Sequence, residues 1–106
     1  MFVPTLARVI VSDDDGKQAR KCEPVWRVIR RYRQRLGHSQ YTLAKRLAEA
    51  SGNRGLTREE VARWERGKRI PGPYWRHWLS AVLQVPQDKL DNAARCARKI
   101  RASRRT

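Results

Sequence analysis

Apolar residues recur at spacings of three and four in five successive segments of this chain, and glycine or proline residues separate the segments. This spacing places apolar side chains on one face of an α-helix, whereas a half-buried strand needs strict alternation. A hydrophobic share of 40% is enough for a modest core. We therefore predict an all-α fold of five helices. The segments are residues 24–37, 39–50, 57–66, 73–83 and 87–100.

Several polar residues mark where these helices begin and end. Pro24 suits a first helical position, and Gly37 suits the residue after a helix. Ser39 is an N-cap candidate. Thr57 and Glu60 fit a capping box, in which the hydroxyl accepts from the amide three residues on and the carboxylate reaches back.

The charge of the chain is unevenly distributed. Lys and Arg total 25 against 10 Asp and Glu, which gives +15. Residues 1–23 are neutral, residues 24–92 carry +9, and residues 93–106 carry +6. Such an excess favours a polyanionic partner. We divide the chain accordingly into an N-terminal arm or leader (1–23), a folded domain (24–92) and a basic C-terminal helix or tail (93–106), which we expect to fray.

Several classes of protein are disfavoured. The sequence has no run of 18 apolar residues that would span a membrane, and it does not begin with the pattern of a secretory signal. His38 and His77 do not fall into an arrangement with a nucleophile and a carboxylate, and no glycine-rich phosphate loop is present. We therefore expect no enzymatic activity and no cofactor.

The two cysteines, Cys22 and Cys96, lie far apart in the sequence. Without a secretory signal, we expect them to be reduced thiols in the cytoplasm. Neither lies at a metal-ligand spacing from the other or from a histidine, so we expect no metal site.

The first residues allow two interpretations. Residues 2–11 are apolar and β-branched, and they fit either an ordered extended arm or a flexible leader. Residues 12–16 form an acidic, turn-like segment.

Four short motifs follow one another along the predicted helices, at residues 29–37, 39–44, 61–67 and 79–86. In this order they resemble the lambda-repressor-like, or XRE-type, helix-turn-helix family over residues 28–90. The resemblance implies a five-helix DNA-binding domain. One departure is the 21 steps from Leu43 to Trp64, where the family pattern is shorter. The extra residues fall in 49–56, so the angle of the third helix to the second stays open.

The same resemblance implies that the helix at residues 57–66 enters the major groove, with base readers at Arg58, Glu59 and Arg63. The two arginines can each make bidentate contacts to guanine, and Glu59 can accept from a cytosine amino group. The alternative for Arg63 is a surface ion pair with Glu59 or Glu60. Glu60 is assigned to the capping box.

Contacts to the DNA backbone are implied at other positions. Gln40, with Tyr41 beside it, would hold a phosphate at the start of the second helix, where the dipole and free amides favour an anion. Lys68 and Arg69 would form a second clamp after the third helix. Arg54 would contact the backbone from the loop or would be a solvated charge. Such contacts fix register and carry no sequence information.

Several other candidate residues are expected to stabilise the fold and not to contact DNA. Arg33 and Glu65 match family positions that pair between the first and third helices, which implies a partly buried ion pair. Trp64, Trp75 and Trp78 lie at core spacings, which favours packing in the core over stacking on single-stranded bases.

The leading hypothesis is a sequence-specific regulator of transcription that binds double-stranded DNA, acts as a repressor and resides with the nucleoid in the cytoplasm. By resemblance, it would bind a pseudo-palindromic operator as a homodimer. The dimer surface would be the fifth helix, with Leu90, Cys96 and Ile100, or the arm at residues 2–11. One alternative is an antitoxin or adaptor that binds a protein partner through this arm. Another is a non-specific nucleoid or RNA binder, which salt dependence would distinguish.

Overall fold

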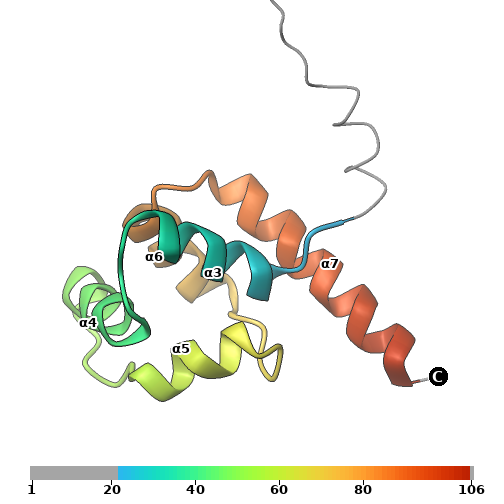
Figure 1. The fold of residues 1–106 in the computed structure, drawn as a ribbon, viewed down its shortest axis with the longest axis horizontal. Coiled ribbons are helices and arrows are strands. Elements are labelled where there is room, and N and C mark those ends of the chain that lie inside the picture. The colour runs from blue at the N-terminus through green and yellow to red at the C-terminus, as the bar shows by residue number, and fades with distance from the viewer. Residues whose placement is uncertain (1–21, 106) are drawn as a thin grey trace, which may run out of the picture.

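The computed structural model describes residues 22–105, and five helices follow one another in this part of the chain (Figure 1). No strand occurs among these residues, so the predicted all-α fold of five helices is confirmed. The arm expected at residues 2–11 and the acidic turn at 12–16 lie outside the described residues. The helices are α3 (Val25–Arg35), α4 (Gln40–Ser51), α5 (Arg58–Glu65), α6 (Pro73–Leu83) and α7 (Gln87–Arg105).

The predicted N-cap residues lie at the starts of α4 and α5, but one of the two predicted caps does not form. Ser39 caps α4, because its hydroxyl oxygen accepts a hydrogen bond from the Thr42 amide at 3.0 Å. Thr57 occupies the N-cap position of α5, but its side chain makes no capping hydrogen bond. The predicted capping box is therefore wrong. The carboxylate of Glu60 instead pairs with the guanidinium of Arg63, and a charged donor is the stronger partner.

The apolar faces of the helices meet in one core. Trp64 of α5 lies at its centre with 1% of its surface exposed, and Trp75 of α6 packs at the edge, 6.1 Å away between ring centroids. Leu36 is exposed, because α3 ends at Arg35 and the chain turns away. The fully buried side chains include Val25, Val28, Ile29, Leu43, Leu47, Val61, Leu79, Leu83 and Leu90.

The additional residues between the second and third helices are divided between helix and loop. α4 continues to Ser51 and ends at Gly52, whose positive φ of 74° closes the helix in a left-handed conformation. Leu56 is buried in the core and anchors the loop that follows. In Figure 1, α4 is seen nearly end-on while α5 runs across the view below it, so the axes of the two helices are steeply inclined to each other. The longer connection therefore preserves a helix-turn-helix arrangement.

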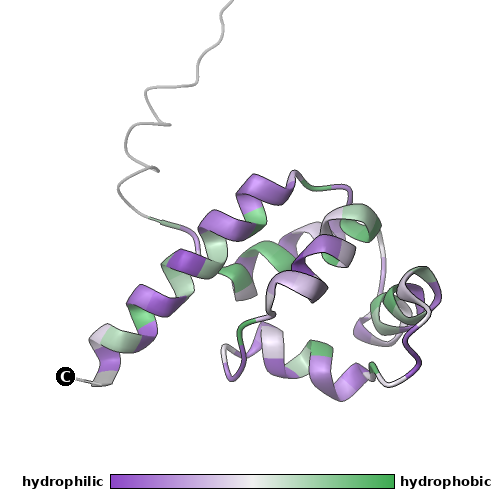
Figure 2. Ribbon diagram, turned by 180° about the vertical axis from the view of Figure 1, so that it is seen from behind, coloured by the Kyte–Doolittle hydropathy of each residue, from purple (hydrophilic) through white to green (hydrophobic). Residues whose placement is uncertain are grey.

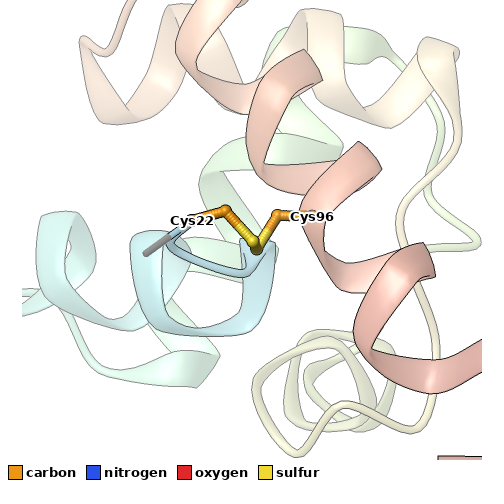
Figure 3. Close-up of a disulfide and its surroundings, with 2 residues drawn as sticks. All are labelled: Cys22 and Cys96. Carbon is orange, nitrogen blue, oxygen red and sulfur yellow. A yellow bond between two sulfur atoms is a disulfide. The ribbon is translucent and has the colours of Figure 1, made fainter. Parts of the chain in front are cut away.

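Cys22 and Cys96 form a disulfide bond (Figure 3). The expectation of two reduced thiols is therefore wrong. α7 packs against α3 and brings Cys96 next to Cys22, with 5.7 Å between the Cα atoms, a distance that a disulfide can bridge. A separation of 74 residues gives no hint of this contact in the sequence. The bond ties the residues before α3 to the middle of α7.

α7 is the longest helix, and it extends beyond the other four helices (Figures 1 and 2). It remains helical to Arg105, whereas the sequence analysis expected this end to fray. The segment contains no glycine or proline that would end a helix. Leu90 and Cys96 are buried inside the chain. Leu90 and Cys96 are therefore unavailable to a second copy, whereas Ile100, the third residue expected at a dimer surface on this helix, is partly exposed.

Candidate nucleic-acid interface

The exposed side of α5 carries the three predicted base readers. Arg58, Glu59 and Arg63 are all exposed, and the opposite side of the helix is fixed in the core by Val61 and Trp64. The helix is only eight residues long, so tertiary packing, rather than helix propensity, must hold it in place. The structure thus brings Arg58, Glu59 and Arg63 together on one short helix.

Both arginines of α5 have a carboxylate partner in the free protein. Nη2 of Arg58 lies 3.1 Å from Oε2 of Glu59, and Nη1 of Arg63 lies 3.2 Å from Oε1 of Glu60. The ion pair considered as the alternative for Arg63 is therefore present, with Glu60 as the partner. Exposed pairs of this kind contribute about 0–1 kcal/mol. A partner that offers two well-placed acceptors can therefore replace the carboxylate at low cost.

Gln40, the expected phosphate clamp, is the first residue of α4. Its Nε2 donates to Oε1 of Glu65 at 3.0 Å, and its Oε1 accepts from Nη1 of Arg58 at 3.3 Å. The side chain therefore connects the interior of the domain to the first residue of α5. Tyr41, next to it, is 64% exposed. The two residues lie at the N-terminal end of α4, as the sequence predicted.

A buried carboxylate fixes α3, α4 and α5 relative to one another. The side chain of Glu65 is fully buried, and Arg33 approaches it with two nitrogens, Nε at 2.6 Å and Nη2 at 3.0 Å. Nε of Arg30 lies 3.5 Å from the same carboxylate, and Gln40 supplies a third donor. Nη1 of Arg33 also donates to the carbonyl of His38 at 2.8 Å. We call Arg30, Arg33, Gln40 and Glu65 the Glu65 network.

Arg30 is a member of the Glu65 network that the sequence did not predict. The spacing in the sequence could have indicated this role, because Arg30 precedes Arg33 by three residues on α3 and therefore lies on the same side of the helix. Nη2 of the Arg30 side chain also donates a hydrogen bond to the backbone carbonyl of Glu65 at 3.3 Å. Arg30 thus adds to the connection between α3 and the end of α5.

The remaining residues that were predicted to contact the DNA backbone lie in two loops. Arg54 is exposed in the loop between α4 and α5. Lys68 and Arg69 are exposed directly after α5, and both backbone amides donate to the carbonyl of Arg63, at 2.9 and 3.3 Å. No ion pair is formed by Arg54, Lys68 or Arg69 within residues 22–104.

The loop after α5 is held against α3 by a close contact that the sequence analysis missed. Gly67 has a positive φ of 75°, and a Cβ atom there would lie 3.2 Å from Cε3 of Trp26. Only glycine fits this combination of backbone conformation and close approach. The position of Lys68 and Arg69 is therefore set by the ring of Trp26.

No helix in the described part of the chain is long and apolar enough to cross a bilayer.

Comparison with known proteins gives one match. Residues 29–73 match a family model described as helix-turn-helix. This region runs from α3 through α4 and α5 to the start of α6 and contains the whole Glu65 network. Neither the curated proteins nor the solved structures contain a match to the chain. Residues 29–73 are therefore a helix-turn-helix domain similar to those of the lambda-repressor-like, XRE-type DNA-binding regulators.

Proposed function

We propose that this protein is a sequence-specific repressor of transcription that reads the major groove of double-stranded DNA with α5. The observation that carries this proposal is the combination of an exposed side with Arg58, Glu59 and Arg63 and an opposite side fixed by the core and the Glu65 network. A reader of bases needs side chains held in one geometry, because a displacement of about 1 Å breaks a bidentate hydrogen bond.

The roles of the exposed residues follow from their chemistry. Arg58 and Arg63 each donate two hydrogen bonds to O6 and N7 of a guanine, and Glu59 accepts from the amino group of a cytosine. Gln40 and Tyr41 contact a phosphate at the start of α4. Lys68, Arg69 and Arg54 contact further phosphates from the loops; these last three roles rest on exposure and on the absence of ion pairs within residues 22–104.

The acidic residues on α5 support specific over generic binding. Glu59 and Glu60 lie among the side chains that would face DNA, and a carboxylate next to a phosphate is unfavourable. Each carboxylate is compensated by an arginine in the free protein. Binding to a wrong sequence would leave Glu59 without a donor, whereas the correct sequence offers it a cytosine amino group. This arrangement lowers affinity for arbitrary DNA.

Repression requires only that the domain occupy a promoter, and we propose that this protein represses transcription in this way. We further propose that it acts in the cytoplasm, where a homodimer binds a pseudo-palindromic operator. Family members of this type bind half-sites about one helical turn apart. Of the three residues expected at a dimer surface on α7, Leu90 and Cys96 are buried and Ile100 is partly exposed, so α7 offers a second copy little apolar surface. The arm at residues 2–11 is the candidate that the sequence offers.

Selection of bound sequences from a random duplex library tests this function. We expect one enriched motif with two inverted halves. Arg58→Ala and Arg63→Ala should each reduce discrimination at one base pair by about 1–3 kcal/mol. Arg95→Ala, which removes the same charge from α7, serves as the control and should leave the motif unchanged. The function is refuted if no motif is enriched, or if both α5 variants weaken all sequences equally.

A further inference from the structure

The second half of α7 is strongly basic. Between residues 92 and 104 it contains no acidic residue. The helix continues past the other four helices, so this part is not enclosed by the fold (Figures 1 and 2). Its basic residues are Arg95, Arg98, Lys99, Arg101 and Arg104.

These cationic residues lie on two different flanks of α7. Arg98 and Arg101, together with Ile70, line an open hollow of about 370 Å³ between α7 and the loop after α5. Arg95 and Lys99 line a different hollow, on the side of the disulfide bond. Only the first flank therefore faces the loop that follows α5.

The side of α7 that packs in the core changes its chemistry along the helix. Leu90, Ala94 and Ala97 are buried and follow one another at spacings of three and four. The next positions at the same spacings are Ile100 and Arg101, which are both half-buried, and then Arg104, which is exposed. After Ile100, the apolar stripe thus continues as an arginine stripe, Arg101 and Arg104, where the helix passes the loop after α5.

One tryptophan connects this arginine stripe to the loop. The guanidinium of Arg104 lies 5.8 Å from the ring centroid of Trp26, a cation–π contact. The same ring lies against Gly67 in the loop. Lys68 and Arg69 follow Gly67 directly, so they lie close to the end of α7. We call Lys68, Arg69, Arg98, Arg101 and Arg104 the basic band.

The basic band has no carboxylate partner within residues 22–104. The nearby acidic side chains are used elsewhere, since Glu65 pairs with Arg33 and Asp91 pairs with Arg76 at 2.8 Å. A cluster of like charges destabilises the folded chain by self-repulsion. The evenly spaced phosphates of a nucleic acid backbone would neutralise these positive charges, and binding would release condensed counterions from the nucleic acid.

We propose that the basic band is a second DNA contact, which binds the phosphate backbone of the duplex beside the bases that α5 reads. This rests on the proposed function, because it takes α5 as the helix in the major groove. α5 and the end of α7 lie along the same edge of the molecule in Figure 1, and the molecule is only 20 Å thick in the viewing direction. The loop that carries Lys68 and Arg69 begins at the end of α5. The band therefore extends from α5 toward the flank of its binding site.

Salt titration with two matched variants tests the proposal. Arg98→Gln with Arg101→Gln removes two charges from the basic band, and Arg95→Gln with Lys99→Gln removes two from the opposite flank of the same helix. Each protein is titrated with salt on one labelled duplex of about 30 base pairs. The band variant should reduce the slope of log K against log [salt] by about 2 and weaken binding roughly 10–100-fold at about 0.1 M salt. The control variant should keep the wild-type slope. Circular dichroism establishes that both variants keep their helices.

A second series places the contact on the duplex. Shortening the duplex stepwise at its ends should remove the difference between wild type and band variant while α5 still binds. Equal slopes for the two double variants, on all duplexes, would overturn the proposal. So would a band variant that changes the oligomeric state in light scattering but leaves the salt slope intact, because the band would then bind a second copy of the chain.

The two proposals fail in different ways. If α5 does not read bases, Arg58→Ala weakens all sequences equally, but the band variant still loses its salt slope relative to the control. If the band does not contact DNA, Arg58→Ala still reduces discrimination at one base pair, and the band variant behaves like its control.

Discussion

α5 and the end of α7 both present exposed arginines, but the charges around them differ. On α5, Arg58 and Arg63 each lie next to a glutamate. On α7, Arg98 and Arg101 have no carboxylate partner within residues 22–104. A compensated arginine gains little from an arbitrary phosphate, whereas an uncompensated arginine gains from any phosphate. The first arrangement favours selectivity and the second favours affinity.

The two regions are also held in place differently. α5 is fixed by a buried core residue, Trp64, and by the Glu65 network. The second half of α7 is held by a cation–π contact to Trp26 and by the disulfide at Cys96. Since base reading needs a fixed geometry and phosphate binding tolerates variation, each mode of fixation suits the proposed role of its helix.

The largest effect should come from breaking the support of α5. Arg33→Ala leaves the fully buried carboxylate of Glu65 without its bidentate partner, which should cost about 3–5 kcal/mol of folding free energy. Arg30→Ala, which removes a half-exposed partner of the same carboxylate, should cost less than about 1 kcal/mol. Urea unfolding measures both. Equal losses would mean that the Glu65 network is not centred on Arg33.

The disulfide should matter for stability and for α7 more than for α5. It joins residues 74 apart, and removing such a bond typically costs about 2–4 kcal/mol. Cys22→Ser should therefore lower the free energy of unfolding by this amount. Hydrogen exchange should increase in α7 but little in α5, because the bond contacts only the former. A larger increase in α5 would show that the two regions are not independently supported.

The sequence predicted the helices well because a helix is a local structure. The spacings around Val28, Leu43 and Leu79 place each apolar side chain where it is buried. The pairing of Arg33 with Glu65 was implied only by resemblance, because no local pattern links residues that are 32 positions apart. The resemblance also predicted which helix would face DNA.

Contacts between distant segments were missed for the same reason. The disulfide of Cys22 with Cys96 depends on α7 packing against α3. The contact of Trp26 with both Gly67 and Arg104 depends on three segments that meet only in the fold. The capping box failed at Thr57 because Glu60 has a competing partner one turn later in the same helix, Arg63. A sequence motif shows which hydrogen bonds are possible, but the hydrogen bond that forms also depends on the charged side chains nearby.

A smaller effect should come from Glu59→Gln, which would make the charge around α5 more like that around the end of α7. Glu59→Gln removes the carboxylate that compensates Arg58, so α5 would bind arbitrary phosphates more readily. We expect non-specific affinity to rise by about 0.5–1 kcal/mol, the size of an exposed ion pair. Discrimination should fall at the base pair that Glu59 reads. Competition between the selected operator and random DNA measures both, and unchanged competition would place Glu59 outside the interface.

The smallest effect should come from the hydroxyl that precedes α5. Thr57→Ala removes a side chain that makes no capping hydrogen bond, so stability should change by less than about 0.5 kcal/mol. Ser39→Ala is the matched control at the start of α4, where the hydroxyl does accept from an amide, and it should cost about 1 kcal/mol. Thermal unfolding of both variants measures the difference. If Thr57→Ala costs as much as Ser39→Ala, the start of α5 depends on its own cap. A smaller cost would mean that Val61, Trp64 and the Glu65 network are sufficient to hold α5.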